Sequence, residues 1–171
     1  MQRVAGDLPK RDMPEKPYRP CVAIVLFNRD GKVLVAERND VEAASWQLPQ
    51  GGIDPEENPA EAALRELEEE IGTAAATVIA EALDWTDYDW PADIDRTPGK
   101  GRFRGQRVKP VALNFAGSDD DIDLATAHPE FRAWKWIDIE EIPRLIVSFK
   151  KPLYVAIVAA FLKTRDGIRD S

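Results

Sequence analysis

Three glutamates in one short segment could together bind a metal ion. Glu66, Glu69 and Glu70 follow a glycine turn at Gly51, and at 100° per residue they project from one side of a helix. The apolar residues of this helix are predicted on the opposite side: Ala60, Leu64, Leu67 and Ile71. Like charges three and four residues apart destabilise a helix by about 0.2–0.5 kcal/mol per pair, so a cation that neutralises them is the simplest explanation. Carboxylate oxygens suit magnesium, with manganese as the alternative.

The spacing of the whole segment favours this interpretation over an ordinary acidic surface, which would only contact solvent. Gly51 is followed after five residues by Glu57, and after seven more by the run Arg65-Glu66-Leu67-Glu68-Glu69-Glu70-Ile71-Gly72. The pattern resembles the Nudix box of nucleoside diphosphate hydrolases. Thr73 departs from it, because the family usually has an aliphatic residue there, but that position packs and does not react.

The resemblance implies how the acidic groups are used. Glu69 and Glu70 would be the central metal ligands, Glu66 would join them, and the main-chain carbonyl of Gly51 would be a further ligand. One carboxylate that is not fully used as a ligand would take a proton from the attacking water. Arg65 is one turn before Glu69 and can orient it. Structural roles are expected for the other fixed residues of the box: Gly51, Glu57, Arg65 and Gly72.

Further characteristic segments occur outside the box, in order along residues 18–161: Tyr18-Arg19-Pro20, residues 45–52, Gly105-Gln106, Pro129-Glu130-Phe131 with Trp134 and Trp136, and residues 147–150. Together they are similar to the bacterial RNA pyrophosphohydrolase and dinucleoside polyphosphate hydrolase subfamily. The resemblance implies an α/β fold of the Nudix type, in which helices cover both faces of a mixed sheet. It also implies removal of pyrophosphate from 5′-triphosphorylated RNA, with cleavage of dinucleoside polyphosphates such as diadenosine tetraphosphate as the alternative.

The same resemblance assigns substrate contacts. Arg19 and Arg38 would contact the 5′ phosphates, and Phe149 would stack a base beside Lys150. Glu130 would assist metal binding or proton transfer. Without the resemblance, Phe149 is equally well interpreted as a core aromatic residue and Glu130 as a surface carboxylate. A further substrate contact is expected from Gln106.

The charge of the chain is unevenly distributed. Its net charge of −8 opposes binding of a polyanion. Residues 96–109, however, contain cationic residues and no acid: Arg96, Lys100, Arg102, Arg104, Arg107 and Lys109. This basic strip predicts a local phosphate site, at which Arg104 and Arg107 would contact RNA. The alternative is a solvated loop, because Pro98, Gly99 and Gly101 interrupt regular structure.

Three features depart from the subfamily. Pro110 occupies a position that is usually aromatic, Arg132 occupies one that is commonly acidic, and the loop at residues 39–45 is longer than in some relatives. We expect these differences to affect the substrate cleft and not the metal-binding helix.

Strands and helices that would position these groups follow from the apolar pattern. Strands are predicted at residues 22–28, 32–37, 46–49, 77–89, 106–116 and 132–138. The box helix would begin with Asn58 as N-cap and Pro59 as its first residue, and end at Gly72. A helical turn at residues 139–142 would stop at Pro143. Apolar spacing predicts a C-terminal amphipathic helix that buries Leu153, Ala156, Ile157, Ala160 and Phe161.

Length and composition predict one domain. The 171 residues suit a single core, expected at residues 18–165 after a mobile leader at residues 1–17. The apolar runs are too short to span a bilayer and the leader has no apolar signal core, so we expect a cytoplasmic protein without a membrane partner. The lone Cys21 is predicted to be a buried small hydrophobic residue. No DNA partner is expected, and the sequence identifies no protein partner.

Three functions stay open on the sequence alone: an RNA 5′ pyrophosphohydrolase, a dinucleoside polyphosphate hydrolase and a non-catalytic nucleotide-sensing module. The last is disfavoured, because modules that lose activity usually lack some of the metal-binding carboxylates. Glu66, Glu69 and Glu70 are all present here.

Overall fold

A sheet of parallel and antiparallel strands forms the centre of the protein. The computed structural model describes residues 15–91 and 100–171. The strands are β1 (Tyr18–Phe27), β2 (Val33–Arg38), β3 (Trp46–Gln47), β4 (Gln50–Gly52), β5 (Ala76–Glu81), β6 (Thr86–Asp89), β7 (Gly105–Phe115) and β8 (Phe131–Ile137). The helices are α1 (Pro59–Ile71), α2 (Ile142–Leu145) and α3 (Lys151–Arg169), with 3₁₀ turns at Lys100–Arg102, Asp119–Asp121, Ile139–Glu141 and Ser148–Lys150.

The strand order is β3-β2-β1-β7-β5, and β4, β6 and β8 pair with β1, β7 and β2 respectively. β1 and β7 are parallel, whereas the other pairs are antiparallel. The mixed sheet confirms the predicted α/β class. In the described part of the chain, no helix has the length and apolar character needed to cross a membrane.

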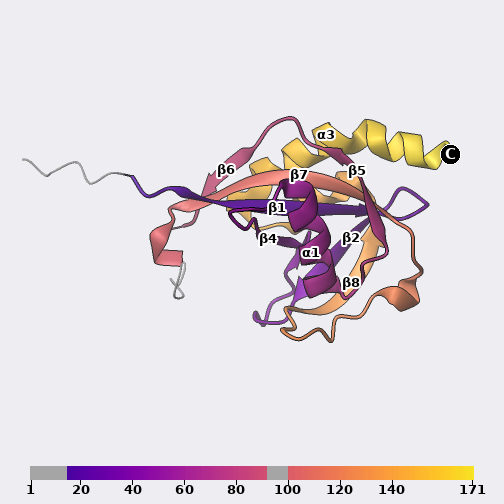
Figure 1. Cartoon of the computed structure of the whole chain (residues 1–171), viewed down its shortest axis with the longest axis horizontal. Coiled ribbons are helices and arrows are strands. Elements are labelled where there is room, and N and C mark those ends of the chain that lie inside the picture. Colours follow the sequence, from indigo (N-terminus) through magenta and orange to yellow (C-terminus); the bar gives the residue numbers. More distant parts are fainter. Residues whose placement is uncertain (1–14, 92–99) are drawn as a thin grey trace, which may run out of the picture.

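Helices cover both faces of the sheet. Figure 1 shows α1 in front of the sheet and α3 along its other side. Because successive side chains of a strand point to opposite faces, β1 contributes to two cores. Residues of β1 that pack in the core with α3 are Cys21, Ala23, Val25 and Phe27. Residues of β1 that pack in the core with α1 are Val22, Ile24 and Leu26. The predicted burial of Cys21 is confirmed, since it is 0% exposed.

The ends of α1 are those predicted from local chemistry. The Asn58 side chain accepts a hydrogen bond from the Glu61 amide at 2.9 Å, and the Glu61 carboxylate accepts one from the Asn58 amide at 3.0 Å. Gly72 ends the helix with φ 78°, a conformation that favours glycine. A Cβ atom on Gly72 would also lie 2.1 Å from the main-chain oxygen of Asp123.

The predicted face of α1 was wrong in one respect. The buried residues are Ala62, Ala63, Leu67, Glu70 and Ile71, while Ala60 and Leu64 are only partly buried. Glu66 and Glu70 therefore follow Ala62 along one row at the border of the buried face. The metal-binding carboxylates do not point away from the core as a group, because α1 is rotated so that two of them enter a cleft.

The strand predicted at residues 77–89 is interrupted. β5 and β6 both pair with β7, but the segment between them lies opposite Pro110. Proline has no N–H to donate to a neighbouring strand, so regular pairing cannot continue past it. One bond remains, from the Ala82 amide to the Pro110 carbonyl at 2.9 Å.

The C-terminal segments differ from prediction in detail. Pro143 lies within the first turn of α2 and does not stop the preceding turn, since a missing N–H costs nothing there. In α3, Ala156 and Ala160 are exposed, and Tyr154 is buried beside the predicted Leu153, Ile157 and Phe161. The helix continues past residue 165, the predicted end of the domain.

Candidate active site

A close approach between β4 and α1 brings a glycine against a carboxylate. A Cβ atom on Gly51 would be 2.0 Å from Cδ of Glu66, whereas real Cβ atoms essentially never approach within 3.0 Å. Glycine is therefore required for Glu66 to hold this position. The two predicted metal ligands Gly51 and Glu66 are direct neighbours in space.

Arg65 joins the glycine turn to the helix. Its guanidinium donates to both carboxylate oxygens of Glu57, at 2.7 Å each, and to the Gly52 carbonyl at 2.9 Å. It also donates to Glu66 at 2.9 Å and to Glu69 at 3.3 Å. The contact with Arg65 lowers the pKa of Glu57, because the guanidinium favours the charged carboxylate. These contacts agree with the structural roles predicted for Arg65 and Glu57.

Glu70 is the buried acidic residue of α1, with 5% exposure. Its Oε2 atom has no hydrogen-bond partner within the described residues. Burial, followed by the nearby carboxyl groups of Glu130 and Glu66, raises the pKa of Glu70 to about 9. A hydrogen bond from the main chain of Gln50 acts in the opposite direction. A cation at this place would relieve both the burial of the charge and the repulsion.

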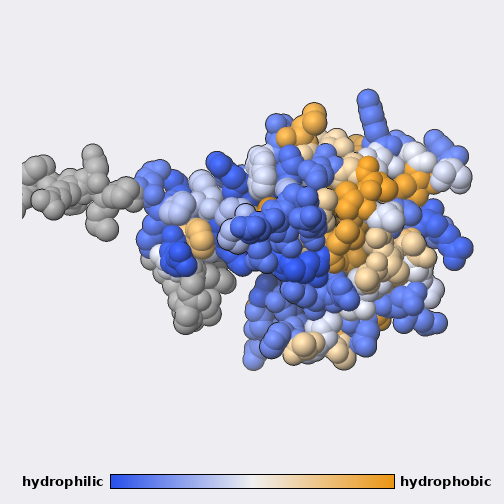
Figure 2. Space-filling model, viewed as in Figure 1, coloured by the Kyte–Doolittle hydropathy of each residue, from blue (hydrophilic) through white to orange (hydrophobic). Residues whose placement is uncertain are grey.

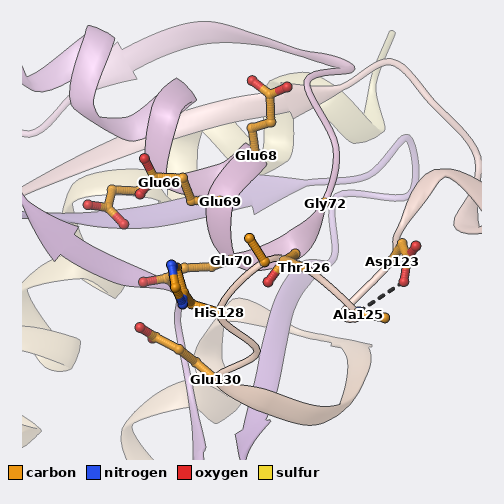
Figure 3. A pocket seen from close by; sticks show the side chains of 11 residues that line it. Glu66, Glu68, Glu69, Glu70, Gly72, Asp123, Ala125, Thr126, His128 and Glu130 are labelled. Carbon is orange, nitrogen blue, oxygen red and sulfur yellow. Dashed lines mark hydrogen bonds between the residues drawn. The ribbon is translucent and has the colours of Figure 1, made fainter.

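Glu130 faces the helix from the segment before β8. Figure 3 shows its carboxyl group on the same side as those of Glu66 and Glu70, whereas Glu68 points away. Burial also raises the pKa of Glu66. The three carboxyl groups lie between two cavities, one of about 690 Å³ and one of about 810 Å³, and line both. The larger cavity also contains His128.

The acidic groups do not yet form a completed metal site. Within residues 15–91 and 100–171, no three Asp, Glu, His or Cys side chains stand in an arrangement that could hold an ion. One reason is that Arg65 engages Glu66 and Glu69. The donor chemistry nevertheless fits a hard divalent cation, because several carboxylates adjoin and a buried oxygen of Glu70 is unpaired. Arg65 would compete with such an ion for the carboxylates of Glu66 and Glu69.

The smaller cavity is a cleft that joins the acidic residues to predicted substrate contacts. Its lining includes Gly51, Glu66, Glu70, Glu130, Arg19, Arg38, Gln106, Phe149 and Lys150. The pairing of β1 with β7 explains part of this, since Arg19 lies directly beside Gln106. The structure thus brings together all the predicted substrate residues except Arg104 and Arg107.

Arg107 lies on the other face of the sheet. Gln106 faces the cleft, so the next residue of β7 must project from the opposite face. There Arg107 donates to both carboxylate oxygens of Asp87 in β6, at 2.8 and 2.9 Å. The prediction that Arg107 contacts substrate has no support from this placement.

Two further residues of the basic strip, Arg104 and Lys109, also have partners outside the cleft. Arg104 donates to Asp89 at 2.9 and 3.0 Å and to Glu15 at 2.7 Å. Lys109 donates to a main-chain carbonyl, that of Leu83, at 3.1 Å. Arg96 lies outside the described residues. Acids from β6 and from the residues before β1 therefore neutralise cations that look unpaired in the sequence.

Arg38 lines the cleft with an acidic partner of its own. Its guanidinium donates to both oxygens of Asp40, and the Nε–Oδ1 distance is 2.8 Å. This pairing raises the pKa of Arg38. A substrate phosphate would compete with Asp40 for the guanidinium.

The departures from the subfamily lie only partly in the cleft, contrary to expectation. Pro110 is buried within β7, and Arg132 pairs with Glu37 at 2.8 Å, so neither lines the cleft. Residues of the longer loop do line it: Asn39, Asp40, Val41 and Ser45.

Two residues without a predicted role belong to the polar network of the cleft. The Gln50 side-chain amide donates to the Tyr88 hydroxyl at 2.9 Å and to Gln106 Oε1 at 2.6 Å. The Tyr88 hydroxyl donates to the same Gln106 oxygen. Gln50 belongs to the Pro-Gln-Gly-Gly segment that carries the resemblance, which was a usable signal. Tyr88 lies inside a predicted strand, where nothing local distinguishes it.

Comparisons with known proteins agree with this arrangement. Residues 17–157 match the NUDIX domain. The chain is 52% identical over 143 residues to an RNA pyrophosphohydrolase of Rhodospirillum rubrum, with coverage of 84% of this chain and 86% of that protein. It is 51% identical over 158 residues to an RNA pyrophosphohydrolase of Acidiphilium cryptum, with coverage of 88% and 95%.

Solved structures show the same fold at lower identity. A C. elegans Ap4A hydrolase binary complex matches with a TM-score of 0.57 and 19% identity, covering 84% of this chain and 98% of that one. The E. coli dihydroneopterin triphosphate pyrophosphohydrolase matches with a TM-score of 0.56 and 22% identity, covering 84% and 97%. At such identities the likeness concerns the fold alone.

Proposed function

Because the chain belongs to the NUDIX family, we propose that it hydrolyses a phosphoanhydride bond of 5′-triphosphorylated RNA, releasing pyrophosphate and leaving a 5′-monophosphate. The observation that carries this proposal is the cleft, in which the carboxyl groups of Glu66, Glu70 and Glu130 adjoin cations and an aromatic ring. The identity to two RNA pyrophosphohydrolases over most of the chain supports the choice of substrate.

A divalent cation is part of the proposal, and magnesium is the ion we propose. Glu66, Glu69 and Glu70 would hold it, with the Gly51 carbonyl as a further ligand. When bound, such an ion supplies positive charge against the phosphate oxygens and lowers the pKa of water. The buried, unpaired oxygen of Glu70 supports this assignment.

The protein's own groups would orient the substrate. Arg19 and Arg38 line the cleft and would contact phosphate oxygens, and the ring of Phe149 would stack a base beside Lys150. A carboxylate that is not fully used as a ligand, either Glu130 or one of those on α1, would accept the proton of the attacking water. We also propose a cytoplasmic location, where such RNA substrates are made.

Hydrolysis of a dinucleoside polyphosphate is the alternative, since it needs the same acidic groups and phosphate contacts. A side-by-side assay with magnesium distinguishes the two. Purified protein is given triphosphorylated RNA or diadenosine tetraphosphate over the same range of concentrations. Pyrophosphate and RNA 5′-monophosphate are measured for the RNA, and the released adenosine mononucleotides are measured for diadenosine tetraphosphate. We expect the larger kcat/KM on RNA. A larger kcat/KM on diadenosine tetraphosphate would select the alternative.

Glu69→Gln is the control that tests the acidic site in the same assay. The Glu69 side chain is 58% exposed, so the substitution should leave the fold intact. It should lower turnover at least about a hundredfold on either substrate, since a metal-binding charge is lost. Equal activity of variant and parent at saturating magnesium would contradict metal binding by α1.

A further inference from the structure

Tyr88 lies beneath the cleft and contacts four of the residues that line it. The residue is 7% exposed and does not itself line the cleft. Its hydroxyl group forms hydrogen bonds with Gln50 and Gln106. Its ring lies 5.8 Å from the Phe149 ring, centroid to centroid, and Lys150 Nζ is 5.8 Å from its centroid. Tyr88 can therefore act on a ligand only through these neighbours.

The hydrogen bonds of this cluster leave one donor and one acceptor for a ligand. Gln50 Nε2 donates both of its hydrogens, to Tyr88 and to Gln106 Oε1, and Tyr88 donates its only hydrogen to the same oxygen. Among the described residues, no hydrogen bond uses Gln106 Nε2 or Gln50 Oε1, and neither atom is a buried group without a partner. Both residues line the cleft.

The hydroxyl of Tyr88 couples the orientations of the two amides. Burial raises the pKa of Tyr88 above its ordinary value, so the hydroxyl retains its proton at neutral pH. Rotation of one amide alone by 180° would place its NH₂ group against a donor or its oxygen against an acceptor, so the two amides can reverse only together with the hydroxyl. Without the hydroxyl, each amide would lose a partner that defines its orientation.

We propose that Tyr88 is a positioning residue, which fixes the Gln50 and Gln106 amides so that the cleft presents an acceptor and a donor to the edge of a nucleobase stacked on Phe149. This inference rests on the proposed function in RNA 5′ processing. The cluster is also close to the acidic site, because Gln50 and Glu70 line the same cleft. A base held at Gln50 would thus have a defined position relative to that carboxyl group.

Tyr88→Phe tests the proposal, because it retains the ring and removes the hydroxyl. Two substrates are compared: a triphosphorylated RNA oligonucleotide, and the same oligonucleotide with its first two nucleotides abasic. We expect kcat/KM on the normal RNA to fall about tenfold, mainly through KM, since about 1.4 kcal/mol corresponds to tenfold. The abasic substrate should change less than twofold. Equal losses on both substrates would overturn the positioning role.

Tyr154→Phe is a matched control. Tyr154 is 1% exposed, and its hydroxyl accepts a hydrogen bond from the Leu48 amide at 2.8 Å, outside the cleft. Loss of this hydroxyl should lower the free energy of unfolding and should not change kcat/KM on one substrate more than on the other.

The parent enzyme separates the two proposals: if it releases no pyrophosphate from RNA, the proposed function fails. If it is active and Tyr88→Phe shows no preference between substrates, the role of Tyr88 alone fails.

A double-mutant cycle keeps the test decisive if Tyr88→Phe is poorly folded. Gln106→Met removes the amide from the cleft while retaining similar bulk. If Tyr88 acts through Gln106, adding Tyr88→Phe to Gln106→Met should lower kcat/KM on normal RNA less than it does in the parent. Thermal unfolding of the four proteins gives the folded fraction used to correct each rate. Additive losses would overturn the proposal.

Discussion

A single buried carboxyl group dominates the chemistry at the scale of the residue. Glu70 is removed from water, adjoins two other carboxyl groups, and has an oxygen without a partner among the described residues. These conditions disfavour its charged form, and in a protein without metal they cost stability. The same conditions favour a cation, so we interpret the cost as one that metal binding offsets.

Glu70→Gln should therefore stabilise the metal-free protein in alkaline solution while abolishing turnover. Between the ordinary pKa of 4.5 and the raised pKa of about 9, the folded state holds a proton that the unfolded state has lost. The stability contribution of Glu70 consequently falls as the pH rises through this interval. Denaturant unfolding in a chelator checks this, since the free-energy difference between variant and parent should grow with pH. Parallel pH profiles would contradict it.

Magnesium should stabilise the parent protein more than it stabilises Glu70→Gln. Added ion should raise the unfolding temperature of the parent, because it binds the folded state. The same concentration should raise that of Glu70→Gln much less. Equal shifts in the two proteins would show that Glu70 is not a ligand.

Phe149 is the residue on which recognition of a base would depend. Phe149→Ala should lower kcat/KM on triphosphorylated RNA by about 1–3 kcal/mol in transition-state terms, because the stacking surface is lost. Hydrolysis of a simple nucleoside triphosphate, which would not span the metal site and the ring in the same way, should fall much less. Since the ring also packs against Tyr88, the folded fraction must be measured for each protein. Equal losses on both substrates would identify Phe149 as a packing residue.

At the scale of the element, the active site depends on how closely β4 approaches α1. The approach leaves no room for a side chain at Gly51, and Arg65 holds the intervening turn through Glu57 and Gly52. The helix is further fixed at both ends by Asn58 and Gly72. The site is therefore a property of the strand, turn and helix together.

Gly51→Ala should displace the Glu66 carboxylate with little loss of stability. The added methyl group would meet the end of a flexible side chain, which can move away. We expect kcat/KM to fall about 10- to 100-fold, as when a group that orients a metal ligand is lost. Gly167→Ala is a control, because nothing lies within 4 Å of a Cβ atom at that position in α3. The hypothesis is falsified if both variants keep full activity.

At the scale of the whole molecule, an acidic protein must attract RNA locally. The net charge is −8, and Figure 2 shows extensive hydrophilic surface around α1, beside a hydrophobic patch over β5. The cations that are paired with acids outside the cleft, Arg104 and Arg107, compensate charge within the protein. Arg19 in the cleft is a better candidate for attracting substrate.

Arg19→Gln and Arg107→Gln form a matched pair on neighbouring strands and opposite faces. For Arg19→Gln, we expect the slope of log kcat/KM against log salt to become shallower by about 0.7, the value for one phosphate contact in a single strand. For Arg107→Gln, the slope should not change. Steady-state kinetics on triphosphorylated RNA over a range of salt concentrations decides between them. The reverse result would restore the basic strip as the site of RNA contact.

Local chemistry explains what the sequence by itself determined. The glycine turn, the N-cap, the C-terminal glycine and the spacing of the glutamates are set within residues 51–72, so their pattern predicted α1 and its acidic groups. Apolar periodicity likewise predicted most strands, and the resemblance of the whole pattern to the Nudix subfamily implied the α/β class. These features depend on the backbone of a few consecutive residues.

Tertiary structure decided which charges are buried and which are paired. The rotation of α1 against the sheet buries Glu70, the β6–β7 pairing brings Asp87 to Arg107 from 20 residues away, and Pro110 interrupts the strand opposite it. Tyr88 likewise reaches Gln50 only across the folded sheet. Such contacts depend on strand register and helix orientation, which arise from packing of the whole core and leave no short pattern in the sequence.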